Sequence, residues 1–197
     1  MTSVASNLVD TPPPAQELVT WAAATAERWL GADAKRWTHV REVARRAQEV
    51  APALPAAQRP LLVAAAYLHD IGWAPGLRDS GFHPLDGARW LRAQGREDLA
   101  GLVAHHSAAD VEAELRGLDD QLGQFPDGPP AVSDALAYCD VTSGSGGGTV
   151  TLDERMADVQ RRYGEDHIVT VAMRRALPLL AAMVERTTTR LGSRAFT

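Results

Sequence analysis

The feature that most constrains the fold is an uninterrupted apolar stretch from Leu61 to Leu68 that runs directly into His69 and Asp70. The stretch follows Pro60, a favoured residue in the first turn of a helix, and Gly72 comes soon after it. A helix that is apolar on every side has to be buried in the middle of a protein. The stretch is also far shorter than the roughly 20 residues that cross a membrane. The sequence therefore predicts a central, buried helix whose C-terminal end carries two polar side chains.

The remaining sequence shows the periodicity of helices and no convincing alternation of strands. Apolar residues recur at helical spacing in four further segments: Leu18, Trp21, Ala22 and Trp29; Val40, Val43, Ala44, Ala47 and Val50; Leu99, Leu102, Val103 and His106; and Val132, Ala135, Leu136 and Cys139. Thr151 and Glu154 form a capping-box pattern for a helix that Gly164 closes, and a long helix starts near Ile168 with Pro178 as a candidate kink. We expect an all-α fold of roughly seven to nine helices.

The limits of the folded domain follow from composition. Residues 1–14 contain three consecutive prolines and no periodicity, so we expect a flexible N-terminal arm there, and a flexible tail at 191–197. A single domain then covers residues 15–190, with its last helices at 151–190. The stretch 117–130 is rich in glycine and proline and is expected to be mostly loop.

Composition excludes several classes of protein. With the single cysteine Cys139, the 197-residue chain can form neither an internal disulfide nor a cysteine-rich zinc or iron–sulfur site. Its formal net charge of -5 argues against binding to a nucleic-acid duplex, which needs a basic surface. The first residues lack the basic and apolar regions of a signal peptide. We therefore expect a cytoplasmic protein without a membrane or nucleic-acid partner.

Five of the six histidines stand, with two aspartates, at or near the ends of predicted helices. They are His39 near the start of the second helix, His69 and Asp70 after the buried helix, His83 before Pro84, His105 and His106 at the end of the next stripe, and Asp140 beside Cys139. Helix ends meet at one end of a bundle, where inward side chains build metal sites. Mixed imidazole and carboxylate ligands favour Mn, Fe, Co, Ni or Zn over Mg or Ca. Taken singly, each residue also has a plain structural interpretation, such as a local hydrogen bond, a helix cap or an exposed histidine, and His167 has only that.

The ordered set resembles the HD superfamily of metal-dependent phosphohydrolases. The matching segments lie within residues 37–143 and read WTHVREVARRA, LLVAAAYLHDIGW, GFHPLDGARWL, LVAHHSAADVEAEL and ALAYCDVTSG. The resemblance implies one metal on His39, His69, Asp70 and Asp140, and a second on Asp70, His83 and one or both of His105 and His106. Helical phase favours His106 over His105. Asp70 is then the catalytic carboxylate that bridges the metals and orients the nucleophile.

The activity that this resemblance implies is metal-dependent hydrolysis of a small phosphorylated metabolite, a nucleotide or related phosphoester, as a phosphomonoesterase or phosphodiesterase. Trp73 stands where related proteins often carry a lysine, and the Glu-Asp pair of alarmone hydrolases and the GYP motif of cyclic-dinucleotide phosphodiesterases are missing. Two alternatives stay open. One is a mixed-valence di-iron oxygenase, whose ligands resemble the same pattern, and the other is a non-catalytic module that binds a ligand through its metal pocket. The sequence leaves the metal, the substrate and the oligomeric state open.

Few residues are candidates for contact with a substrate. Arg78, between the HD pair and His83, either binds a phosphate group or is solvated. Arg161 and Arg162 are expected to serve a helix C-terminus, and Trp73 either flanks the substrate or packs on the buried helix. The GSGGG loop at 144–148 either closes over the site or links two helices at the surface.

Overall fold

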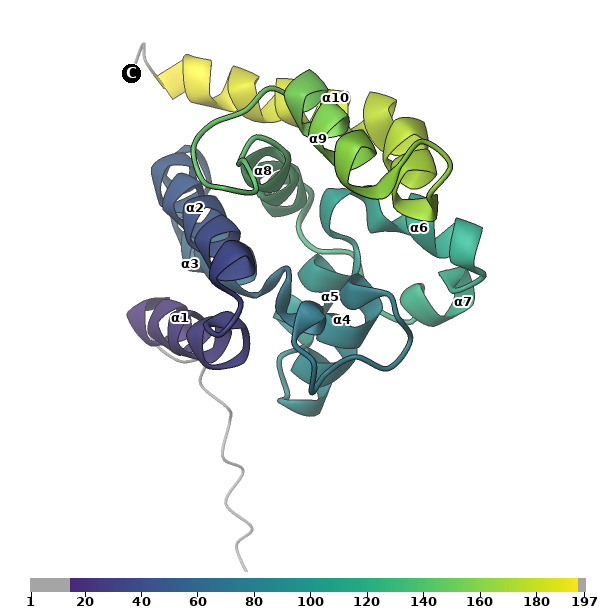
Figure 1. Cartoon of the computed structure of the whole chain (residues 1–197). Helices are drawn as coiled ribbons and strands as arrows, with labels where there is room; N and C mark the ends of the chain where they lie inside the picture. The colour runs from purple at the N-terminus through teal and green to yellow at the C-terminus, as the bar shows by residue number, and fades with distance from the viewer. Residues whose placement is uncertain (1–14, 195–197) are drawn as a thin grey trace, which may run out of the picture.

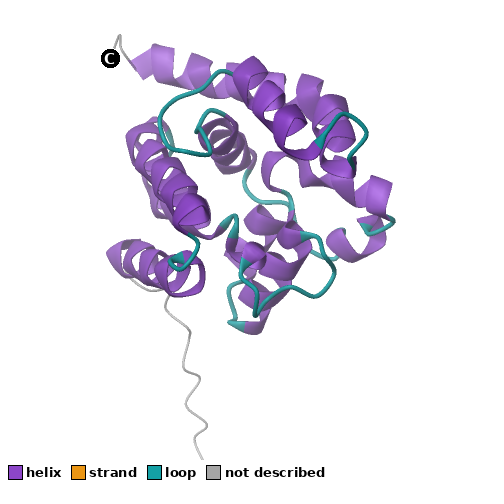
Figure 2. Cartoon of the chain, in the orientation of Figure 1, coloured by secondary structure: helices purple, strands orange, loops and turns teal. Residues whose placement is uncertain are grey.

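The computed structural model describes residues 15–194, and the regular elements in this part of the chain are helical (Figure 2). The α-helices are α1 (Ala15–Leu30), α2 (Ala34–Val50), α3 (Arg59–Leu68), α4 (His83–Ala93), α5 (Glu97–Ala104), α6 (Ala109–Arg116), α7 (Asp119–Leu122), α8 (Pro130–Val141), α9 (Leu152–Tyr163) and α10 (Ile168–Arg194). The predicted all-α class is confirmed, and α7 is a single turn. The expected arm at 1–14 and residues 195–197 lie outside the described residues, whereas 191–194 continue α10. No helix within residues 15–194 is both long and apolar enough to cross a membrane.

The central helix of the bundle is α3, which packs against α1, α2, α5 and α8 (Figure 1). Leu62, Leu68 and the three alanines between them are fully buried, which confirms the predicted central helix. Leu61 and Tyr67 differ, since both are only half-buried. Full burial of each leucine contributes about 1.5–3 kcal/mol. The core therefore fixes where α3 ends and where the two polar residues after it lie.

The turn after α3 holds the start of α4 in place. Residues Ile71–Trp73 form a 3₁₀ turn, and a Cβ atom on Gly72 would lie 2.0 Å from the carbonyl oxygen of His83. Only glycine permits this approach, because it has no side chain. The sequence predicted Gly72 as a helix stop, and the structure adds that it seats the first turn of α4 beside the end of α3.

The segment after α5 departs from a regular helix. The apolar stripe predicted a helix that ends at His106, but α5 ends at Ala104, and Ser107 and Ala108 follow with φ of 52° and 58°. Two residues in the left-handed region turn the chain before α6 begins. The expected loop at 117–130 is interrupted by α7.

The last two helices cover one side of the bundle (Figure 1). The predicted capping box starts α9: the backbone N–H of Thr151 donates to Glu154 Oε2 at 2.7 Å, and that of Glu154 donates to Thr151 Oγ1 at 3.1 Å. The 27-residue α10 packs against α6, α8 and α9, and Pro178 lies inside it without ending it. This packing brings α9 and α10 close to the ends of α5 and α8, where the candidate ligands lie.

Candidate metal centre

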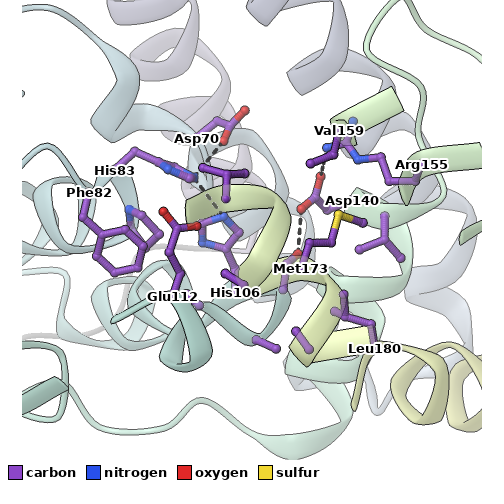
Figure 3. Close-up of a pocket in the computed structure, with 18 of the residues that line it drawn as sticks. Asp70, Phe82, His83, His106, Glu112, Asp140, Arg155, Val159, Met173 and Leu180 are labelled. Carbon is purple, nitrogen blue, oxygen red and sulfur yellow. Dashed lines mark hydrogen bonds and ion pairs between the residues drawn. The ribbon is translucent and has the colours of Figure 1, made fainter. Parts of the chain in front are cut away.

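Six of the side chains predicted as metal ligands converge from five helices. His39 projects from α2, His69 and Asp70 follow α3, His83 is the first residue of α4, His106 follows α5, and Asp140 lies near the end of α8. All are buried except His83, which is half-buried. Figure 3 shows Asp70, His83 and His106 close together, with Asp140 to their right beside Arg155.

A first group of ligand atoms combines two histidines with two carboxylates. His39, His69 and Asp70 each offer an atom, and these atoms lie within 4.8 Å of one another. Asp140 extends the group, because its Oδ1 is 3.0 Å from His39 Nε2 and 3.8 Å from His69 Nε2. These four residues are the set that the sequence resemblance assigned to one metal.

A second group shares Asp70 with the first. Asp70, His83 and His106 also offer ligand atoms within 4.8 Å of one another. His83 Nε2 lies 3.2 Å from Asp70 Oδ1 and 3.3 Å from His106 Nε2. The other oxygen, Asp70 Oδ2, is 3.7 Å from His69 Nε2. The two oxygens of one carboxylate thus face two ligand groups, as a carboxylate that bridges two ions requires.

The hydrogen bonds of His69 and His106 show which ring nitrogens are free to bind a metal. Nδ1 of His69 donates to the carbonyl oxygen of Ala66 at 2.8 Å, and Nδ1 of His106 donates to that of Val103 at 2.7 Å. A neutral imidazole has one N–H, so each ring keeps a lone pair on Nε2. Nε2 of His69 is buried and has no hydrogen-bond partner among residues 15–194. Such a buried polar atom is costly without a partner, and a divalent cation satisfies it, so the residues present fit a metal.

His39 leads to the same conclusion. Its Nδ1 lies 3.4 Å from the carbonyl oxygen of Gly144, and its Nε2 lies 3.0 Å from Asp140 Oδ1. A neutral imidazole has one N–H and cannot donate to both oxygens, whereas a cation bound by Nε2 and the carboxylate leaves that N–H for Gly144. Gly144 begins the GSGGG loop, so this loop contacts a candidate ligand and is more than a linker.

The two carboxyl groups are held in their ionised form. Burial favours a raised pKa for Asp70, but Arg36, whose Nη1 lies 2.6 Å from Asp70 Oδ2, and a hydrogen bond with His83 outweigh burial and hold that pKa well below its usual value. Burial likewise opposes ionisation of Asp140, but its hydrogen bond with His39 and the nearby Arg155 guanidinium lower its pKa well below the usual value. Both groups are therefore carboxylates at neutral pH.

Three histidines of the cluster are held in their neutral form. Burial lowers the pKa of His69, His83 and His106, and it outweighs the opposing effect of the nearby carboxylates. Neutral imidazoles and ionised carboxylates are the forms that bind metals. The cluster therefore presents these donors in the protonation state that a divalent ion needs.

The structure does not bring His105 to the cluster, which corrects the expectation that it joins the ligands. Its Nδ1 lies 2.8 Å from Asp110 Oδ1, and its Nε2 lies 3.0 Å from the carbonyl oxygen of Phe125. These contacts engage both ring nitrogens of His105 outside the two ligand groups. The hydrogen bond to Asp110 raises the pKa of His105, in contrast to the lowered pKa of the clustered histidines.

Arg78 is not among the residues that line the cavity, so of its two predicted alternatives, contact with a phosphate group or solvation, the structure favours solvation. Its side chain is exposed, and its Nε donates to the carbonyl oxygen of Trp73 at 2.9 Å. The indole of Trp73 stacks on His83 with ring centroids 4.6 Å apart. The guanidinium of Arg36, which also pairs with Asp70, lies 4.7 Å from the centroid of the Trp73 ring. Trp73 therefore packs against a candidate ligand.

Three other arginines line the cavity beside the cluster, namely Arg36, Arg155 and Arg162. Arg155 Nη2 lies 3.3 Å from Asp140 Oδ1, and Arg162, which was expected only at a helix C-terminus, pairs with Asp158 at 2.8 Å. The sequence held one signal for Arg36, since it precedes His39 by three residues and shares its helix face. It held none for the other two, because nothing local places α9 beside the cluster.

The cavity is bounded by the cluster on one side and by α9 and α10 on the other (Figure 3). Its volume is about 150 Å³, enough for a small ligand and far too little for a folded macromolecule. Ser107, from the left-handed turn, donates its hydroxyl to Asp140 Oδ2 at 2.6 Å and so fixes the orientation of that carboxylate at the cavity wall.

The protein is thus an all-α bundle that gathers histidines and carboxylates from five helices around one cavity. These residues form a candidate dinuclear metal centre. A family model described as HD domain matches residues 36–141, more than half of the chain, and the chain belongs to the HD domain family. This membership places it in a superfamily of metal-dependent hydrolases. Neither the curated proteins nor the solved structures gave a match.

Proposed function

We propose that the protein is a metal-dependent phosphohydrolase that acts on a small phosphorylated metabolite. The observation that carries the proposal is the pair of overlapping ligand groups that share Asp70, with the lone pair of His69 Nε2 buried between carboxylates. A buried donor set of this kind is costly to the fold unless a cation occupies it. The hydrolase character of the HD domain family supports the same conclusion.

In this proposal the first metal is held by His39, His69, Asp70 and Asp140, and the second by Asp70, His83 and His106. The donors are imidazoles and carboxylates, so the ions are divalent transition metals from Mn, Fe, Co, Ni and Zn. When bound, such a pair supplies a water of lowered pKa and positive charge beside the phosphoryl oxygens. Hydrolysis joins a water oxygen to phosphorus and breaks the ester P–O bond, and a proton from that water ends on the departing alcohol.

The surrounding residues orient the ligands and the substrate. Stacking of Trp73 on His83 and the hydrogen bond from Ser107 to Asp140 each fix a ligand in place. Arg36 and Arg155 lie beside the two carboxylates and also line the cavity, so their guanidinium groups are placed to bind phosphoryl oxygens. Arginine has to fill this role because Lys35 is the only lysine in the chain and its side chain is exposed.

The test is a panel of phosphomonoesters and phosphodiesters, assayed for phosphate or alcohol release before chelation, after chelation and after each metal is restored. We expect turnover that disappears on chelation and returns with a transition metal. Arg36→Ala should lower kcat/KM by about tenfold or more. Its matched control is Arg78→Ala, which removes the exposed arginine on the same indole and should leave kcat/KM within twofold.

Three results would contradict the proposal. Turnover that survives complete metal removal would exclude a metal-dependent mechanism. Two bound irons with oxygen-dependent substrate cleavage, measured with an oxygen electrode, would identify a di-iron oxygenase instead. A fully metal-loaded protein that turns over no ester in the panel would favour a non-catalytic binding module.

A further inference from the structure

The cavity is chemically divided into a charged side and an apolar side. On the charged side lie the candidate ligands together with Arg36, Arg155 and Arg162. The opposite wall comes from α10, which contributes Val169, Ala172, Met173, Ala176 and Leu180. Figure 3 shows Met173 and Leu180 among the side chains that line the cavity, together with Asp140 and Arg155.

The α10 wall offers a ligand no polar side chain. Its five members stand three, four, seven and eleven residues from the first, so they occupy one face of the helix. The exposed side chains of Arg174 and Arg175 lie on the other side of α10. Ala172, Ala176 and Leu180 are buried, whereas Val169 and Met173 are half-buried, so these two keep the most surface of the five residues that line the cavity.

Two polar groups near this wall are already engaged within the protein. The hydroxyl of Ser107 donates to Asp140, and the carboxylate of Glu112 accepts from Arg116 Nε at 2.8 Å. A sugar or nucleobase placed against the five α10 residues would find no hydrogen-bond partner among their side chains. An apolar group placed there instead gains free energy in proportion to the surface it buries.

We infer that the substrate of this centre is a phosphomonoester of an apolar alcohol, whose phosphate meets the cluster and the arginines while its hydrocarbon part lies against the α10 wall. This inference rests on the proposed function, since it names the substrate class of the same site. It replaces the nucleotide that the sequence suggested. A single amphipathic small molecule would then contact the charged side and the apolar side of the cavity at the same time.

The experiment uses two matched series on the metal-loaded protein: hydrolysis of methyl, butyl and hexyl phosphate, and binding of the corresponding non-hydrolysable alkylphosphonates by calorimetry. We expect kcat/KM and phosphonate affinity to rise by roughly fourfold for each methylene buried. Adenosine monophosphate and glycerol phosphate should be poorer substrates than hexyl phosphate. A nucleotide that exceeds hexyl phosphate, or a series that is flat with chain length, would overturn the inference and leave the proposed function standing.

A pair of variants on one helix locates the effect. Met173→Gln makes the wall polar at nearly constant volume and should reduce the ratio of hexyl to methyl kcat/KM at least about fivefold. Met183→Gln, on the same helix but outside the cavity, should leave the ratio unchanged. Equal ratios in both variants and the wild type would contradict the assignment of the wall.

The two proposals fail in different ways. Chain-length-dependent phosphonate binding without hydrolysis of any phosphate ester would refute the proposed function and retain the apolar subsite. Absence of both binding and hydrolysis in the metal-loaded protein would overturn both.

Discussion

Two histidines of the cluster owe their orientation to the same local device. His69 and His106 each follow the last turn of a helix, and each donates Nδ1 to the carbonyl oxygen of the residue three positions earlier. The unprotonated Nε2 of both rings is thereby aimed away from their own helices, and the two rings lie with centroids 5.4 Å apart. The backbone thus sets the tautomer of both rings before any ion is bound.

The neighbouring histidines 105 and 106 provide a matched pair of variants. His106→Ala removes a candidate ligand. Loss of a residue that only hydrogen-bonds to a metal ligand lowers metal affinity roughly 10–100-fold, so loss of the ligand itself should weaken binding of one metal by more than that. His105→Ala removes a ring that contacts Asp110 and Phe125 and should keep the metal content of the wild type. Elemental analysis after dialysis measures both.

The metal content of these two variants shows whether His106 alone binds the metal, as the structure indicates, or whether His105 also does, as the sequence pattern allows. Loss of metal in His105→Ala, with normal metal content in His106→Ala, would contradict the placement of the rings. Equal loss in both would mean that the pair acts together, as the resemblance alone allowed.

Sequence reasoning found the ligand candidates because their residue types and order are unusual. It could not choose firmly between His105 and His106, because that choice depends on a left-handed turn at Ser107 and Ala108. Neither serine nor alanine is typical of that conformation, which glycine and asparagine favour, so the turn has no local signal. Tertiary packing imposes it.

At the scale of elements, the junction of α3 and α4 positions both ligand groups. Gly72 packs against the backbone of α4. A Cβ atom added at position 72 would lie 2.0 Å from the carbonyl oxygen of His83 and 2.7 Å from the backbone nitrogen of Gly87. The first turn of α4 can therefore approach the end of α3 only while position 72 has no side chain. His83 and Asp70 owe their contact at 3.2 Å to this approach.

Gly72→Ala should lower the free energy of unfolding by about 1–3 kcal/mol, because a methyl group has no room there. It should also reduce metal content, since His83 has to move with the backbone. Gly192→Ala in α10, where an added Cβ meets open space, is the control and should be neutral or stabilising by up to about 1 kcal/mol. Urea unfolding measures stability, and an unchanged midpoint in Gly72→Ala would contradict the packing described.

A second element-scale contact fastens α10 to α8. Asp134 is buried, and its carboxylate accepts from Arg186 Nη2 at 2.6 Å and from Arg190 Nη1 at 3.0 Å. Burial opposes ionisation of Asp134, but the hydrogen bonds from both arginines outweigh it and lower its pKa. Since the folded pKa lies below the unfolded one, this stabilisation is present above about pH 4 and is lost as pH falls through the folded pKa.

Asp134→Asn should therefore destabilise the protein by about 1–3 kcal/mol at pH 7, and the difference from wild type should shrink below about pH 4. Urea unfolding at a series of pH values between 7 and 3 measures this. Asp120→Asn, at an exposed position in α7, should change stability by no more than about 0.5 kcal/mol. A difference for Asp134→Asn that is independent of pH would show that the ion pairs do not anchor α10.

At the scale of the whole molecule, the fold collects helix ends into one chemical site. The periodicity of the sequence was enough to predict an all-α protein with a buried central helix, because local patterns dictate those features. The position of α9 and α10 over the cluster was not predictable in this way, because it depends on long-range packing. As a result, the sequence revealed the candidate ligands, while the arginines of α9 and the apolar wall of α10 became visible only in the folded chain.

The central claim is that Asp70 links two metal ions in one centre, and metal content per chain tests it most directly. Wild-type protein supplied with Mn, Fe, Co, Ni or Zn and then desalted should hold two ions per chain, and Asp70→Ala should hold none. Asp79→Ala, which removes an exposed carboxylate from the loop between Asp70 and His83, should still hold two ions. Wild-type protein that binds no metal, or Asp70→Ala that retains two ions, would contradict the account.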